Sequence, residues 1–175
     1  MSTVEIIDYI TGNPVLFAFM ILLVHSLQRK FYKNIFTAWI FDIFGVFFHE
    51  VAHFVVGAIL NAKPFAFSVI PQKTQYGYML GHVQFSNVKW YNAIPTAFAP
   101  FLLLILAFYI DKYFFVFFEK NVLSYFLYLF IIVVTITSAI PSSQDFKVAR
   151  SSFTGIVFYV VLCYIGGYFL IERLL

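Results

Sequence analysis

His49, Glu50 and His53 stand in the pattern His-Glu-x-x-His within a long apolar stretch of the chain. On a helix, two histidines at this spacing lie one turn apart on the same face, where their imidazoles can grip one zinc ion. The glutamate beside them can take a proton from water at the metal. We therefore predict a zinc site at the two histidines and a catalytic role for Glu50. The alternative is a structural polar cluster, although ionisable groups at membrane depth usually have a function.

Two histidines leave a catalytic zinc one protein ligand short, so a third must come from elsewhere in the chain. The candidates are His25 in the first apolar run, His82 in a β-rich run, and Asp145 beyond the fourth apolar run. Pro141 breaks the helix before Asp145 and lets the backbone turn back toward the core. We predict Asp145 as the third ligand, and the alternative is a solvated loop acid.

Two further polar side chains could serve the site. Asp42 lies seven residues before His49, on the same helical face. It could orient a histidine or line a water path, or it could simply face a neighbouring helix. His82 could contact substrate or play an auxiliary part, although a histidine in a strand is ordinarily structural.

The composition indicates a membrane protein. Of 175 residues, 62% are hydrophobic and 11% charged, whereas soluble domains run to roughly a quarter charged. The length predicts one domain, residues 1–175, so we expect any regulatory domain to come from a partner protein. The formal charge of +3 is small and scattered, which argues against nucleic acid as a partner. The one cysteine, Cys163, lies in an apolar run and is interpreted as a small hydrophobic side chain.

The apolar runs predict the helices. A helix needs about 20 mostly apolar residues to cross a bilayer. Five candidate runs occupy about 14–27, 35–60, 92–110, 122–140 and 153–171. Asn13 is the expected N-cap of the first run, with Pro14 at its first helical position. The domain is thus divided into an N-terminal extra helix (13–28), a catalytic core (about 34–150) and a C-terminal helix (about 152–172).

The segment between the second and third runs is not helical in pattern. Residues 65–70 and 79–85 are β-rich and flank residues 72–77, which have the composition of a turn. We predict a β-hairpin, which must lie at the membrane surface or be covered by protein, because open strand edges are not tolerated in lipid. The expected fold is therefore an all-α polytopic membrane protein of about five transmembrane helices, with a membrane-associated β-hairpin between the second and third.

In this order of elements the chain resembles the site-2 protease family of intramembrane zinc metalloproteases, from about residue 43 to residue 150. The family has His-Glu-x-x-His in a transmembrane helix, then a membrane-associated hairpin, then a helix opening with a small residue and proline. A later Asn-x-x-Pro segment with an aspartate-glycine supplies its third metal ligand. The counterparts here are His49 to His53, Phe65 to Phe85, Ala99-Pro100, and Ser138-x-x-Pro141 with Asp145. Ser138 and Phe146 stand where asparagine and glycine are usual.

The resemblance implies an intramembrane protease without a soluble regulatory domain. Its expected cofactor is one Zn²⁺ per chain, held by His49, His53 and Asp145, with Glu50 as catalytic base. Ser138, His82 and Asp42 are expected to bind substrate or support the ligands. The implied substrates are transmembrane or membrane-bound peptides, cleaved in a bacterial cytoplasmic membrane with the active site opening toward the cytosol. The positive-inside rule does not fix this orientation, because lysines and arginines divide almost evenly between the two sides.

Other functions fit the sequence less well. Membrane di-iron hydroxylases and desaturases need many more histidines than the four present, and the paired glutamate of prenyl-processing membrane proteases does not occur. A membrane scaffold or chaperone that binds helical clients stays open as a non-enzymatic alternative. The intact Glu50 favours the protease, because a protein that only binds has no use for a general base.

Overall fold

The computed structural model describes residues 3–32, 34–74 and 77–174. Its helices are α1 (Thr3–Gly12), α2 (Pro14–Phe31), α3 (Ile35–Ile59), α4 (Ala93–Ala97), the 3₁₀ turn η1 (Ala99–Phe101), α5 (Leu102–Phe117), α6 (Val122–Ser138), α7 (Ser143–Arg150) and α8 (Phe153–Leu174). The strands β1 (Pro64–Ser68), β2 (Gln72–Thr74), β3 (Gly77–Met79) and β4 (His82–Phe85) lie between α3 and α4. Helices therefore make up most of the described chain, as expected.

Five helical segments of the described chain are long and apolar enough to cross a membrane. They occupy Pro14–Phe31, Ile35–Ile59, Ala99–Phe117, Val122–Arg150 and Phe153–Arg173. The first begins as predicted, since the Asn13 side chain accepts hydrogen bonds from the N–H groups of Val15 and Leu16 and Pro14 occupies the first helical turn. The five predicted apolar helices are thus all present.

The third predicted helix differs from the expectation of one continuous run over 92–110. It is divided into α4, the turn η1 and α5, and α5 continues to Phe117. Pro100 lies at the division and has no N–H to donate, so the hydrogen-bond ladder of α4 cannot run on through it. The single-helix prediction was wrong at this point.

Two helices were not predicted. The ten residues of α1 are too few to cross a bilayer, so a search for long apolar runs passes over them. No helix was predicted over the eight residues of α7, and a loop was considered there only as the alternative for Asp145. The sequence nevertheless contains a signal for a helix start at this point. Ser142 and Asp145 form a capping box, in which each side chain accepts a hydrogen bond from the other's backbone N–H.

The β-hairpin is present but is built from two short ladders. Antiparallel pairing joins β1 to β4, with Ser68 opposite His82, and β2 to β3, with Lys73 opposite Tyr78. The predicted turn at residues 72–77 is therefore wrong for Gln72–Thr74 and Gly77, which belong to strands, while Gln75 and Tyr76 lie outside the described residues. Pro71, which cannot donate to a ladder, lies between β1 and β2.

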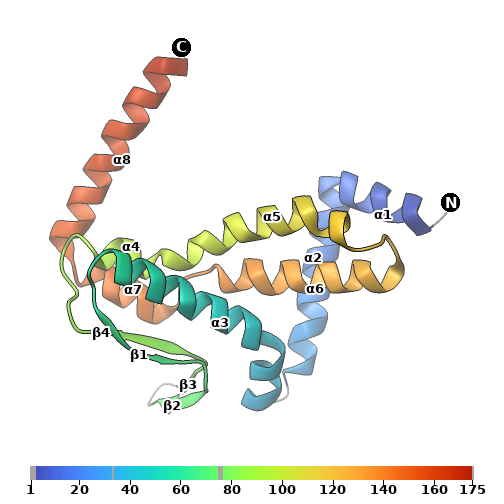
Figure 1. The fold of residues 1–175 in the computed structure, drawn as a ribbon, viewed down its shortest axis with the longest axis horizontal. Coiled ribbons are helices and arrows are strands. Elements are labelled where there is room, and N and C mark those ends of the chain that lie inside the picture. Colours follow the sequence, from blue (N-terminus) through green and yellow to red (C-terminus); the bar gives the residue numbers. More distant parts are fainter. Residues whose placement is uncertain (1–2, 33, 75–76, 175) are drawn as a thin grey trace.

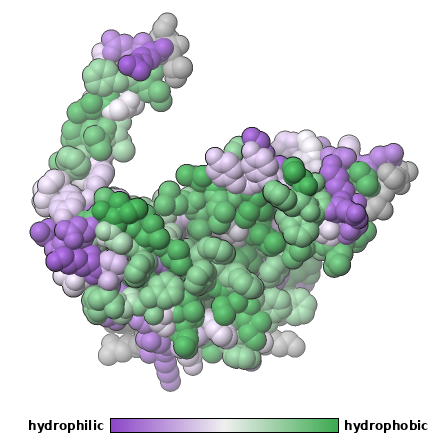
Figure 2. All heavy atoms as spheres, in the orientation of Figure 1, coloured by the Kyte–Doolittle hydropathy of each residue, from purple (hydrophilic) through white to green (hydrophobic). Residues whose placement is uncertain are grey.

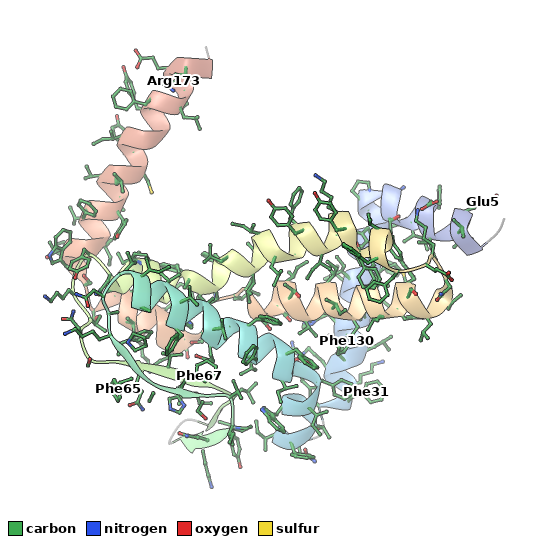
Figure 3. The ribbon with its side chains drawn as sticks, viewed as in Figure 1. Glu5, Phe31, Phe65, Phe67, Phe130 and Arg173 are labelled. Carbon is green, nitrogen blue, oxygen red and sulfur yellow. The ribbon has the colours of Figure 1, made fainter. Side chains whose placement is uncertain are left out.

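The hairpin lies along α3. The Phe67 ring on β1 meets the Phe47 and Phe54 rings of α3 edge-on, at centroid distances of 6.1 and 6.3 Å (Figure 3). Such aromatic pairs add to the stabilisation that the buried area provides. The contacts fix β1 beside the middle of the helix that carries His-Glu-x-x-His.

Helices α3, α5 and α6 lie side by side, with α2 crossing them (Figure 1). The main buried cluster joins α1, α5 and α6, and consists of Ile7, Phe114, Tyr125, Tyr128, Leu129 and Ile132. The hydroxyl of Tyr128, which is a buried member of this cluster, donates to Oδ1 of the exposed Asp111 at 2.5 Å, so the buried hydroxyl has a partner. The core thus sits at the α1 end of the bundle.

Helix α8 leans away from the other helices, and Arg173 marks its far end in Figure 3. Its side chains are mostly exposed apolar groups. Figure 2 shows apolar residues over the middle of the visible face, with hydrophilic residues at the foot and far end of α8 and around α1. This distribution is typical of a protein whose helices face hydrocarbon.

Candidate metal centre

Four residues at every fourth position of α3 form one stripe along the helix: Gly45, His49, His53 and Gly57. The two glycines bracket the histidines and let neighbouring elements come close. A Cβ on Gly45 would collide with the Ser138 side chain of α6, and one on Gly57 would collide with the Phe85 ring of β4. The stripe therefore draws both α6 and the hairpin against the histidine face.

Each histidine is oriented by a backbone carbonyl. His49 Nδ1 lies 2.7 Å from the carbonyl oxygen of Ser138, and His53 Nδ1 lies 2.7 Å from that of Thr96. A carbonyl can only accept, so both Nδ1 atoms carry the proton and donate it. In a neutral imidazole this leaves Nε2 without a proton and able to bind a cation.

Neither carbonyl accepts the hydrogen bond that a continuing helix would supply from the residue four positions later. In a continuing helix the Thr96 carbonyl would accept from the N–H four residues later, and that residue is Pro100, which has none. Ser138 ends α6, and Pro141 follows three residues later. The N–H of Ser142, four residues beyond Ser138, donates instead to Asp145.

The three predicted ligands converge. The Nε2 atoms of His49 and His53 are 3.1 Å apart, and the Asp145 carboxylate lies 3.5 Å from the first and 3.2 Å from the second. All three ligand atoms fall within 4.8 Å of one another. When both imidazoles are neutral, their unprotonated Nε2 atoms and the Asp145 carboxylate are all electron-pair donors. A cation between them could bind all three groups. The donor set, two imidazoles and one carboxylate, fits a catalytic zinc site.

Asp145 reaches the histidines from the first turn of α7. Its Oδ2 accepts the Ser142 N–H at 2.6 Å, and its own N–H donates to the Ser142 hydroxyl at 3.3 Å. The capping box therefore fixes the carboxylate at one end of the site. The alternative of a solvated loop acid does not hold, because Asp145 lies in a helix and its side chain lies beside both histidines.

Glu50 lies next to the ligands and is 7% exposed. Gly81, at the bend before β4, packs against it, since a Cβ there would come within 3.0 Å of Glu50 Oε1. His53 is 5% exposed, whereas His49 and Asp145 keep 13% and 14% of their side-chain surface. The cluster is thus closed on the Glu50 and His53 side and open toward His49 and Asp145.

The open side faces a cavity of about 720 Å³. Its walls come from α3, the β3–β4 segment, α4, the end of α6 and the start of α7. Both histidines, Glu50 and Asp145 line it, together with His82 and Asp42. A volume of this size is within the range of small-molecule and peptide-binding sites.

The supporting residues lie in different places. Asp42 lines the far part of the cavity, where Oδ1 accepts a 2.6 Å hydrogen bond from Tyr32, so its partner is not a histidine. Burial and this hydrogen bond raise the pKa of Tyr32. His82 lines the cavity from β4, and its buried Nδ1 has no hydrogen-bond partner among the described residues. The cluster that the described residues form includes neither His25 nor His82.

Thr96 and Ser142 are the contributors that the sequence interpretation missed. Thr96 acts through its backbone, and the sign that could have revealed it is Pro100 four residues later. Ser142 was recognisable from the capping pattern Ser-x-x-Asp. Ser138 was expected to support the site, and it does so through its carbonyl.

Comparisons with family models, curated proteins and solved structures give no match to this chain.

Proposed function

We propose that this chain is an intramembrane zinc metalloprotease of the site-2 protease type, which hydrolyses peptide bonds of transmembrane or membrane-bound peptides. The observation that carries the proposal is the convergence of His49 Nε2, His53 Nε2 and the Asp145 carboxylate beside the buried Glu50. Two imidazoles and a carboxylate are the donor set of a catalytic zinc site, and an adjacent glutamate can serve as its base.

Zinc in this site would be held by His49 Nε2, His53 Nε2 and the Asp145 carboxylate. When bound, zinc supplies a Lewis acid that polarises the peptide carbonyl and makes water more acidic. Glu50 accepts a proton from the attacking water, whose oxygen forms the new bond to the carbonyl carbon. Glu50 then gives the proton to the leaving nitrogen as the C–N bond breaks. The Ser138 and Thr96 carbonyls keep both imidazoles in the tautomer that the site needs.

We propose that the substrate binds at the hairpin. A transmembrane helix hides its peptide bonds in its own hydrogen bonds, so a substrate must become extended before it is cut. The β1–β4 sheet has two strands, so each has a free edge to which an extended segment can add. Residues of the β3–β4 segment, including Tyr78 and His82, already line the cavity.

The proposal includes a membrane location with several spans, on the strength of five apolar helices. From the resemblance to the site-2 protease family, we also assign the hairpin and Asp145 to the cytosolic side of a bacterial cytoplasmic membrane. Regulation is assigned to a partner protein or to prior trimming of the substrate.

The test compares the wild type with Glu50→Gln in proteoliposomes that contain a set of membrane peptides, with new termini read by mass spectrometry. We expect cleavage by the wild type, at least a thousandfold less by the variant, and one zinc per chain in both. Glu119→Gln, an exposed glutamate before α6, is the matched control and should cleave normally. Equal cleavage by the wild type and Glu50→Gln would refute the assignment, and zinc without cleavage of any peptide would favour a scaffold.

A further inference from the structure

A second hollow lies on the opposite side of α7 from the metal cluster. It is a groove of about 460 Å³ between α4, α7 and α8. Ile94 and Phe98 of α4 form one wall, Phe146 and Ala149 of α7 the second, and Ile156 and Val160 of α8 the third. Every one of these side chains is apolar, so the groove excludes polar ligands along most of its length.

The groove exists because the hydrogen bond and the aromatic contact that join α8 to the rest of the described chain lie at its foot. Tyr159 donates to the Tyr91 carbonyl at 2.5 Å, and Phe158 packs edge-on against Trp90 with ring centroids 5.2 Å apart. Gly155 allows the close approach, because a Cβ there would collide with the Trp90 carbonyl. Beyond these contacts α8 diverges from the other helices (Figure 1). The space between α8 and helices α4 and α7 stays open along Val160 and Cys163.

The size of the groove selects a thin occupant. A helix with its side chains is about 10 Å across and rises about 5.4 Å per turn, so roughly 420 Å³ is needed for a single turn. The groove therefore encloses the volume of about one turn of a helix, and a longer helix could only lie across its opening. A single acyl chain is far narrower and fits beside Phe98 and Ile156 in full apolar contact.

One end of the groove is charged. Arg150 is the last residue of α7 and lines the groove where α7 meets α8. It takes part in none of the ion pairs that the described residues form, which join Asp145 to two histidines and Lys120 to Asp8. Trp90, which is 46% exposed, and Tyr91 lie at the same end, and these residue types favour the headgroup level of a bilayer.

We propose that this groove binds an anionic phospholipid, with an acyl chain between α7 and α8 and the phosphate at Arg150. Basic pockets between membrane helices suit such headgroups. The site is distinct from the proposed hydrolysis and needs only the membrane location of the helices. It also bears on the metal centre, because α7 presents Phe146, Ala149 and Arg150 to the groove and Asp145 to the histidines. Bound lipid therefore stabilises α7, the helix that carries Asp145.

The test places the whole chain in nanodiscs of phosphatidylcholine with a minor share of phosphatidylglycerol, and native mass spectrometry then identifies the lipid retained on release. We expect phosphatidylglycerol to be enriched about fivefold over its bulk share, the factor that one arginine near a membrane surface contributes. Arg150→Gln should abolish the enrichment. Arg173→Gln, the same change at the far end of α8, should leave it intact.

A second pair of variants tests the apolar part. Val160→Trp fills the groove from its open end and should abolish retention of any lipid, whereas Val161→Trp, exposed on α8 but outside the groove, should not. Hydrogen exchange over residues 143–150 should be slower in phosphatidylglycerol for the wild type only. Enrichment that survives Arg150→Gln, or lipid retention that survives Val160→Trp, would overturn the proposal whether or not the chain proves to be a protease.

Discussion

His53 Nδ1 lies 2.7 Å from the carbonyl oxygen of Thr96, 43 residues further along the chain. That carbonyl is free to accept because Pro100 stands where the next helical donor would be. The orientation of a ligand is thus decided by a residue that touches neither the histidine nor the metal position. At His49 the arrangement differs, because the residue four positions after Ser138 is Ser142, whose N–H donates to Asp145 instead.

Pro100→Ala restores an N–H that competes with His53 for the Thr96 carbonyl. We expect zinc affinity to fall about tenfold, within the range found when a partner of a metal-bound histidine is lost. Competition with a fluorescent zinc chelator measures the change. Pro14→Ala, in the first turn of α2, is the control and should bind zinc like the wild type, and an unchanged affinity for Pro100→Ala would contradict this role.

Asp145→Asn keeps the size of the side chain but removes its charge. We expect a loss of zinc affinity greater than the roughly 10–100-fold that partners of the ligands cost, because here a ligand itself is weakened. Metal analysis after dialysis against a chelator reads the result. Asp8→Asn breaks only the pair with Lys120 and should retain zinc, and retention by both variants would remove Asp145 from the site.

Gly45→Val tests the close approach of α3 and α6. The added side chain must displace Ser138, whose carbonyl then loses His49. We expect zinc affinity about 10–100-fold lower and a lower melting temperature, with Gly45→Ala intermediate. Gly166→Val is the control, since nothing lies within 4 Å of a Cβ at Gly166. Normal zinc binding by Gly45→Val would show that this contact is dispensable.

Tyr32→Phe tests the hydrogen bond to Asp42 through its pH dependence. Burial and Asp42 raise the pKa of Tyr32 above its ordinary value of 10.0, so the folded protein holds this proton more tightly than the unfolded chain. The resulting stability is fully present below pH 10 and is lost as the pH rises further. Melting temperatures from pH 8 to 11.5 should show a gap between wild type and variant that is constant up to about pH 10 and narrows above it. A gap that widens there would contradict the raised pKa.

The sequence predicted the residues that cluster at the candidate site better than it predicted the elements that hold them. His49, Glu50 and His53 follow from a local pattern, and Asp145 follows from the need for a third ligand near a helix break. The carbonyls of Ser138 and Thr96 could not be predicted in the same way, because every residue has a carbonyl and only the fold selects two of them. Helix α7 was overlooked for a different reason: it is short and polar, and its capping box was the one local signal of it.

The division of the hairpin into two ladders also lay beyond the sequence pattern. The β-rich runs located β1 within two residues and β4 within three. They gave no account of β2, whose polar residues Gln72 to Thr74 resemble a turn in composition but pair with β3. Strand pairing depends on the partner across the ladder, which a local window does not contain.

The two carboxylates of the site have a joint consequence for its place in an apolar bundle. Glu50 and Asp145 contribute two negative charges when both are ionised, and histidines bind a metal ion in their neutral form. A divalent cation bound there brings the sum to zero. An electroneutral group of this kind costs far less to enclose in a low-dielectric interior than any of its charged parts alone. The Ser138 and Thr96 carbonyls thus select, among the neutral forms of each imidazole, the one that lets a divalent cation complete an uncharged centre.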